Sequence, residues 1–167
     1  AVHHRAAPHH RLALVDEEAD RDDLDAVVDG RADLVVAGGA GRALGRPQDA
    51  LRLEDEAERL KIRFNQAFWM EDERFFAAAL DADKQQVRTL MSNPGHGLYS
   101  GIVDEDKALP LAKRLLAPDM FSGWGFRTMS RSAAAYNPMS YHNGSVWPHD
   151  NALIAQGSPE SWRAALL

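Results

Sequence analysis

The sequence contains no cysteine, which excludes disulfide bonds and thiolate metal sites. Basic residues are also in the minority, because 19 Lys and Arg stand against 25 Asp and Glu for a formal net charge of −6. That balance argues against a general phosphate-binding surface, and so against nucleic acid as the main partner. No apolar run approaches the roughly 18 residues of a membrane helix. We therefore expect no membrane partner, and the absence of cysteine suits a cytoplasmic protein.

Residues 1–30 differ in composition from the rest of the chain. Residues 16–29 include eight Asp or Glu, and only Leu24, Val27 and Val28 form an apolar pattern. We expect a short solvated helix or a poorly ordered tail, since so little apolar surface cannot support a packed core. Residues 38–41, Gly-Gly-Ala-Gly, lack the Lys-Ser/Thr of a Walker loop and a full GxGxxG frame. We interpret them as a flexible turn.

The hydrophobic spacing predicts a mainly helical chain. Apolar residues recur every three to four positions across residues 47–69, which is typical of an amphipathic helix. The expected inward residues of this helix are Ala50, Leu53, Ala57, Leu60, Phe64 and Phe68. Residues 74–80 and 86–90 flank a polar turn and predict a β-hairpin.

Two further helices are expected in the second half of the chain. One follows Asp104, which can cap it, and runs to about residue 117. Pro110 lies inside that helix and should cost up to ~3 kcal/mol or delay the start of the helix. The other begins near Pro148, with residues 152–155 facing inward. The short tail at residues 161–167 fits no element.

Two loops between these elements are aromatic and polar. Residues 136–151 hold two Tyr, two His, one Trp, three Asn and one Asp, but almost no core-forming residues. Burying such a segment would leave polar groups unpaired, at about 1–3 kcal/mol each. We therefore interpret it as a loop that presents aromatic faces and hydrogen-bonding groups to a polar ligand. Sugars match that description, as does the second aromatic loop at residues 121–128.

Individual residues in these loops have competing interpretations. Trp124 and Trp147 lie among Gly, Ser and Pro, where sugar stacking competes with structural plugging. Arg127 could donate hydrogen bonds to hydroxyls or form a salt bridge. Asp150 falls in the first turn of a predicted helix, so it could complement the helix dipole or accept hydrogen bonds from a sugar. The sequence leaves these alternatives open.

Other chemistries have less support. His142, His149 and Asp150 match no zinc spacing such as HExxH, and the N-terminal histidines are typical of a solvated terminus, so we predict no metal and no cofactor. A triad with Ser145 lacks a GxSxG motif. Glycoside hydrolysis needs two carboxyl groups at a defined separation. Only Asp119 and Asp150 are plausible in the loop region, so the catalytic pair stays unknown, with Asp150 as a candidate.

Four segments, residues 67–87, 92–102, 117–128 and 136–155, resemble the bacterial amylo-α-1,6-glucosidase (glycogen debranching enzyme-like) proteins of the six-hairpin glycosidases. The resemblance covers about residues 43–157. It implies a mainly α fold, a partial (α/α)6 toroid with long aromatic and polar loops and a small β-hairpin. It also implies hydrolysis of α-glucosidic bonds by inversion. The residues that it implies at the sugar cleft are His96, Trp124, Arg127, Tyr136, Asn137, Tyr141, His142, Trp147, His149 and Asp150.

The chain departs from the family pattern at both ends. The segments expected to carry the general acid and the general base, upstream of residue 40 and downstream of Asn151, show no resemblance. We therefore expect residues 41–157 to be a fragment of the catalytic domain, between an atypical segment at 1–40 and an atypical tail at 158–167. The fragment would bind an oligosaccharide or α-glucan but be inactive alone. Its exposed helix faces predict self-association. The alternatives are a non-catalytic carbohydrate-binding module and a helical scaffold.

Overall fold

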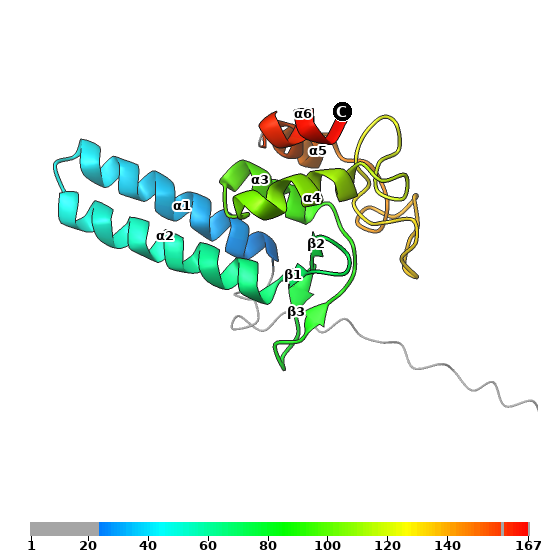
Figure 1. Ribbon diagram of the computed structural model, residues 1–167, viewed down its shortest axis with the longest axis horizontal. Coiled ribbons are helices and arrows are strands. Elements are labelled where there is room, and N and C mark those ends of the chain that lie inside the picture. The colour runs from blue at the N-terminus through cyan, green and yellow to red at the C-terminus, as the bar shows by residue number, and fades with distance from the viewer. Residues whose placement is uncertain (1–23, 158, 167) are drawn as a thin grey trace, which may run out of the picture.

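The computed structural model describes residues 24–157 and 159–166, and this part of the chain is mainly helical. Figure 1 shows α1 and α2 as a long antiparallel pair that extends away from the shorter helices and the strands. The elements are α1 Leu24–Ala43, α2 Pro47–Ala67, β1 Trp69–Met70, β2 Phe75–Phe76, β3 Ala79–Leu80, β4 Gln86–Val87, the 3-10 helix η2 Asn93–Gly95, α3 His96–Ser100, α4 Glu105–Leu115, α5 Pro148–Gln156 and α6 Pro159–Leu166. The N-terminal histidines and residues 16–23 lie outside the described residues.

Helix α1 differs from what we expected of this region. Residues 24–40 are helical rather than poorly ordered, and the turn predicted at residues 38–41 lies inside the helix. Leu24, Val27 and Val28 are each 8% exposed or less. Gly41 lies against α2, where an added Cβ would be 3.4 Å from the backbone nitrogen of Ala50. Packing against α2 therefore outweighs the poor helix propensity of the glycines, which is about 1 kcal/mol each.

Helix α2 confirms the prediction for residues 47–69. Pro47 occupies the first turn, where its missing N–H costs nothing. Ala50, Ala57 and Phe64 are buried on one face, while the opposite face carries i,i+4 ion pairs. At its last turn, the buried Asn65 donates to the carbonyl of Ile102 at 2.7 Å. This bond ties α2 to the segment before α4.

The predicted hairpin is present but shorter than expected. β3 pairs with β4 around a turn in which Asp81 Oδ1 accepts from the backbone N–H groups of Asp83 and Gln85, at 2.9 and 2.8 Å. Phe75 and Phe76 belong instead to a second hairpin, where β2 pairs with β1. Both phenylalanines are fully buried. The aromatic part of the predicted strand is thus drawn into the core.

Helices α4 and α5 begin close to the predicted positions. α4 follows Asp104 and continues through Pro110, so the proline does not delay its start. Within α5, Ile154 is fully buried, but Ala152 and Ala155 are exposed, so the prediction of an inward run at 152–155 is wrong for these two alanines. The residues that fitted no element form α6, whose Trp162 donates to the carbonyl of Ile154 at 3.0 Å.

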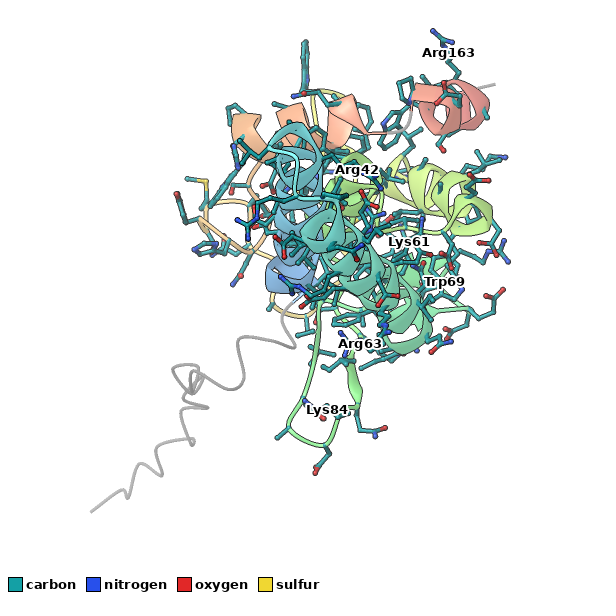
Figure 2. The ribbon with its side chains drawn as sticks, turned by 90° about the vertical axis from the view of Figure 1, so that its left-hand side faces the viewer. Arg42, Lys61, Arg63, Trp69, Lys84 and Arg163 are labelled. Carbon is teal, nitrogen blue, oxygen red and sulfur yellow. The ribbon has the colours of Figure 1, made fainter. Side chains whose placement is uncertain are left out.

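The α1–α2 pair keeps apolar side chains on its surface. The exposed ones include Val35, Val36, Leu51 and Ile62 on the helices and Leu44 in the connection between them. Figure 2 shows charged side chains on the same two helices, among them Arg42 and Arg63. Self-association through these faces stays a prediction. Within the described part of the chain, no helix combines the length and the apolar character that crossing a membrane requires.

Candidate functional site

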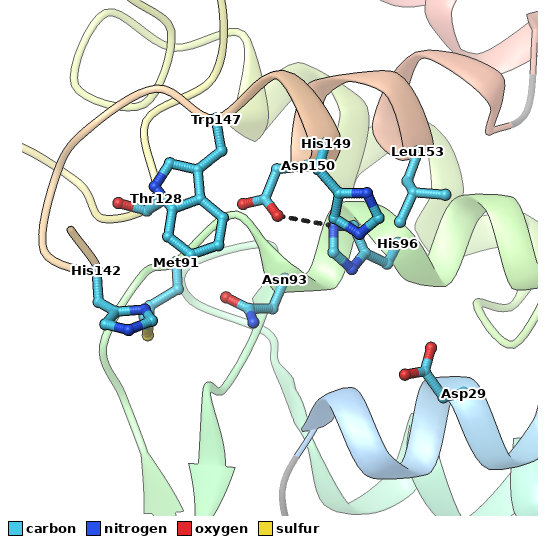
Figure 3. A pocket seen from close by; sticks show the side chains of 10 residues that line it. All are labelled: Asp29, Met91, Asn93, His96, Thr128, His142, Trp147, His149, Asp150 and Leu153. Carbon is cyan, nitrogen blue, oxygen red and sulfur yellow. Dashed lines mark ion pairs between the residues drawn. The ribbon is translucent and has the colours of Figure 1, made fainter.

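A cavity of about 300 Å³ lies between the start of α5, the segment around η2 and one end of α1. Figure 3 shows Trp147 and His142 on one side, His96 and His149 on the other, and Asp150 between them. The lining residues are Asp29, Met91, Asn93, His96, Thr128, His142, Trp147, His149, Asp150 and Leu153. This volume is at the lower end of the range for small-molecule pockets. It suits a single sugar ring better than an extended chain.

Asp150 is the most buried charged group at this cavity, with 9% of its surface exposed. Ser92 Oγ donates to Asp150 Oδ2 at 2.7 Å, and His96 Nε2 lies 3.5 Å from Asp150 Oδ1. Burial by itself would raise the pKa of Asp150. His96, the hydrogen bond from Ser92 and the nearby His149 outweigh burial and hold that pKa below its usual range. The carboxyl is therefore ionised at neutral pH.

Two close approaches by glycine fix the position of Asp150. A Cβ on Gly95 would lie 2.6 Å from Ile154 Cγ1, and a Cβ on Gly157 would lie 2.6 Å from Leu98 Cβ. The two glycines let α5 pack directly against η2 and α3. A residue with a Cβ could not approach its neighbours so closely. The carboxylate at the start of α5 is thereby brought to Ser92 and His96.

The two aromatic loops are joined to α5 by a single amide side chain. Asn151 Oδ1 accepts from the backbone N–H of Phe126 at 2.7 Å, and Asn151 Nδ2 donates to the carbonyl of Trp147 at 2.8 Å. Nearby, Thr128 Oγ1 accepts from the buried N–H of Gly144 at 2.9 Å. Polar groups in these loops are thus satisfied internally, as buried polar groups require.

The indole of Trp147, in the wall of the cavity, is braced by neighbouring side chains. Trp147 Nε1 donates to Ser145 Oγ at 2.9 Å, and the rings of Tyr141 and Trp147 are 4.2 Å apart. His142 also packs on Trp147, at 5.4 Å between ring centroids. The indole therefore has a fixed orientation, with Tyr141 as its support.

The structure brings five of the ten sequence-predicted site residues together at the cavity, namely His96, His142, Trp147, His149 and Asp150. The other five do not line it. Tyr141 lies behind Trp147, and Tyr136 lies against Gly144, where a Cβ would be 2.4 Å from the Tyr136 ring. Asn137 Oδ1 accepts from the N–H of Met139.

Arg127 and Trp124 complete this group. Arg127 Nη1 donates to the carbonyl of Pro118 at 3.3 Å, so this bond stabilises the loop. Trp124 is 96% exposed on its own turn. The structure thus gives Arg127 a backbone acceptor and leaves the Trp124 ring accessible.

The sequence interpretation missed several residues at the site. Those that line the cavity are Asp29, Met91, Asn93, Thr128 and Leu153. Ser92 and Asn93 belong to a polar, glycine- and proline-containing cluster, which could have signalled a binding loop. Nothing in the local pattern of Asp29 separates it from the other acidic residues around it. Its place at the cavity depends on how α1 packs.

Asp119, the other carboxylate considered from sequence, lies outside this cavity. Arg114 contacts it with two hydrogen bonds, of 2.8 and 2.9 Å, and Ser130 donates a third. Burial would raise the pKa of Asp119, but these bonds prevail and lower the pKa to about 2. Because these protein donors occupy the Asp119 carboxyl, we assign it to stabilising the loop and not to binding a ligand.

Comparison with known families decides what kind of domain carries this cavity. Residues 31–164 match the family described as mannosylglycerate hydrolase MGH1-like glycoside hydrolase domain. The chain belongs to this MGH1-like family. The match extends beyond the resemblance at residues 43–157 in both directions, and it includes most of α1 and part of α6. No curated protein sequence matches the chain.

The MGH1-like domain also resembles solved structures. A chain described as "Sialidase" superposes with a TM-score of 0.70 at 14% identity, over 86% of this chain and 13% of that chain. A likeness at this identity shows the fold alone, and our chain spans only a small part of that protein. The helical architecture and the family match are consistent with part of an α/α toroid of a glycoside hydrolase, which confirms the predicted fold class.

Proposed function

We propose that the cavity binds one sugar ring and that the chain serves a glycoside hydrolase of the debranching type, acting on α-glucosidic bonds. The observation that carries the proposal is an ionised, buried Asp150 beside Trp147 in a cavity of about 300 Å³. A carboxylate accepts hydrogen bonds from hydroxyls, and an indole offers an apolar face to the C–H side of a sugar. Membership of a glycoside hydrolase family supports a carbohydrate as the ligand.

The low pKa of Asp150 assigns its role within this proposal. A general acid needs a pKa near the working pH, so that it can hold a proton and then release it. Asp150 is ionised and already accepts a hydrogen bond from Ser92. A carboxylate has about four acceptor positions, which leaves room for a sugar hydroxyl. We therefore assign Asp150 to substrate binding and to orienting His96.

Asp29 is the second carboxylate among the described residues that line the cavity. Figure 3 shows it on α1, apart from Asp150 and the histidines. An inverting glycosidase uses two carboxyls about 6.5–9.5 Å apart, one of which must be protonated. An ionised Asp150 could serve only as the base of such a pair, and it is already engaged by Ser92 and His96, so we expect sugar binding without turnover from this chain alone. Asp29 would contact a hydroxyl at the mouth of the cavity.

The substrate class is a choice between two carbohydrates. The family description names mannosylglycerate hydrolase, whereas four long segments resemble debranching enzymes. We favour an α-glucan because those segments include the loops that form the cavity. Mannosylglycerate is the competing ligand, and a helical scaffold that binds neither is the competing function.

Calorimetric titration of the full chain tests the proposal. We expect maltotriose or isomaltotriose to bind more tightly than mannosylglycerate, and Asp150→Asn to weaken binding about tenfold, since a hydrogen bond to a charged group contributes roughly 1.5–3 kcal/mol. Asp106→Asn is the matched control, because its carboxyl on α4 is 81% exposed and does not line the cavity.

Four outcomes would contradict parts of the proposal. Equal binding by Asp150→Asn and the wild type would remove Asp150 from the site. Tighter binding of mannosylglycerate would reassign the substrate, and no sugar binding at all would favour the scaffold. Glucose release that Asp29→Asn abolishes would show that Asp29 is a catalytic carboxyl.

A further inference from the structure

Asn143 is followed by Gly144, and an Asn-Gly pair is the sequence in which asparagine most readily loses its side-chain amide. Glycine has no side chain to hinder its own N–H, which is the group that reacts. Of the five asparagines in the sequence, two precede a proline, which has no N–H, and two precede a residue inside α2 or α5, whose N–H is used by the helix. These four are Asn93, Asn137, Asn65 and Asn151. Asn143 is therefore the asparagine that is chemically disposed to this reaction.

The reaction needs only water. The Gly144 nitrogen loses its proton to a base and attacks Cγ of Asn143, so that a bond forms between the two atoms. The bond from Cγ to the side-chain nitrogen then breaks, and ammonia leaves after taking up a proton. Water opens the resulting succinimide ring at either carbonyl carbon, which gives aspartate or isoaspartate. Both products carry a new negative charge, and isoaspartate also adds a carbon atom to the main chain.

The fold requires glycine at position 144. Gly144 has a φ of +145°, which residues with a side chain rarely adopt. A Cβ there would also lie 2.4 Å from the ring of Tyr136 and 3.3 Å from the backbone carbonyl carbon of Asn137. A bulkier residue at 144 is therefore excluded as a way of slowing the reaction. Protection of Asn143 must come from the surroundings of the Gly144 N–H.

Thr128 supplies such surroundings. Its Oγ1 accepts a 2.9 Å hydrogen bond from the buried N–H of Gly144, and Thr128 itself is only 6% exposed. The carbonyl groups on either side are bonded as well. The carbonyl of Asn143 accepts from the N–H of Asn137 at 2.7 Å, and that of Ser145 accepts from the N–H of Thr128 at 2.9 Å. A proton held in a buried hydrogen bond is out of reach of base in solution, so the reaction must wait for this segment to open.

We propose that Asn143–Gly144 is a site of spontaneous deamidation, and that the hydrogen bond from Gly144 to Thr128 controls its rate. The modified residue follows His142 and lies in the loop that leads to Trp147, both of which line the cavity. In isoaspartate, the carbonyl that accepts from Asn137 becomes a carboxylate outside the main chain, so this wall of the cavity is distorted. The reaction requires no ligand and occurs whatever the cavity binds.

Incubation of the full chain at mildly alkaline pH tests the proposal. Modification is followed by tandem mass spectrometry of the tryptic peptide at residues 132–163, which also contains Asn137 and Asn151 as internal references. We expect Asn143 to be the modified residue, about tenfold more slowly in the native protein than in urea, since a buried hydrogen bond must open first. Thr128→Val, which has a similar shape but no acceptor, should lose most of this protection. Thr128→Ser, which keeps the hydroxyl, is the matched control and should react as slowly as the wild type.

Circular dichroism should show that the variants are folded without urea, and all of them should react equally fast in urea. Equal wild-type rates with and without urea would overturn the protection by the fold, and this comparison requires no variant. A folded Thr128→Val that reacts as slowly as the wild type would show that the bond to Gly144 does not control the rate. Modification at Asn137 or Asn151 in place of Asn143 would overturn the site itself.

The distortion of the loop has its own test. The isoaspartate form, purified from the incubated protein, should unfold at a lower temperature than Asn143→Asp, which has the new charge but a normal main chain. Equal unfolding temperatures would overturn the distortion.

Discussion

Ser92 Oγ donates a 2.7 Å hydrogen bond to Asp150 Oδ2, although the two residues are 58 positions apart in the chain. This bond joins a polar breaker segment to the first turn of α5. It also holds the carboxylate at the centre of the candidate site. Because both groups are buried, the bond links the stability of the fold to the charge state of the site.

Replacing Ser92 by Ala should destabilise the protein and raise the pKa of Asp150. The carboxylate loses a buried donor, at a cost of roughly 1.5–3 kcal/mol. Urea unfolding at neutral pH measures the first effect, and NMR titration of the Asp150 side chain measures the second. Ser100→Ala is the control, since Ser100 Oγ makes only a 3.4 Å contact with a backbone carbonyl. Equal stability of the two variants would contradict this account.

Asp119 should make stability depend on pH in the acid range. Its pKa is lowered to about 2 in the folded state, against about 3.9 for an unfolded chain. A lowered pKa contributes stability above the unfolded value, and that contribution is lost as pH falls from about 5 towards 2. Asp119→Asn should therefore cost about 1–2 kcal/mol at pH 7, after allowance for solvent screening.

The free energy of unfolding as a function of pH checks this prediction. The gap between Asp119→Asn and the wild type should shrink as the pH falls through that window. Asp106→Asn, with its exposed carboxyl, should show no such gap. A gap that stays constant from about pH 7 to the lower end of that window would mean that the ion pair with Arg114 is not the cause.

Asn151 should be more important for stability than an average loop-facing amide. Asn151→Ala leaves the N–H of Phe126 without its partner and removes the side-chain donor to the carbonyls of Phe126 and Trp147, of which the latter keeps the backbone N–H of residue 151. A buried unsatisfied group costs about 1–3 kcal/mol, so a loss of about 2–3 kcal/mol is expected in thermal or urea unfolding. Asn137→Ala provides the comparison, because the exposed Asn137 accepts one local bond. A larger effect from Asn137 would contradict the assignment of Asn151 as the connector.

Gly39→Ala should stabilise the protein if α1 is a helix. A Cβ on Gly39 would meet nothing within 4 Å, and alanine is favoured over glycine in a helix by about 0.8–1 kcal/mol. Gly45→Ala should have the opposite sign, since Gly45 has a φ of +69° after the end of α1. Thermal unfolding of the two variants reports both signs. Destabilisation by Gly39→Ala would support the flexible turn that the sequence predicted.

The sequence by itself determined the elements whose signals are local. The apolar spacing of α2, the position of Asp104 before α4, the proline at the first position of α5 (Pro148) and the polar turn around Asp81 each predicted the right element at nearly the right place. Periodicity and turn chemistry act within a few residues, so they can be read without knowing the fold. The aromatic loops were likewise recognisable from their composition.

Only the tertiary structure decided the rest. Helix α1 contains glycines that propensity disfavours, and its stability comes from packing on α2. Asp29 reaches the cavity through that packing, and Trp124 is kept out of it by the turn around Ser122. Asp150 acquires its low pKa from Ser92 and His96, which are distant in sequence. Burial, hydrogen bonding and charge depend on neighbours that the fold brings together, and no local pattern records them.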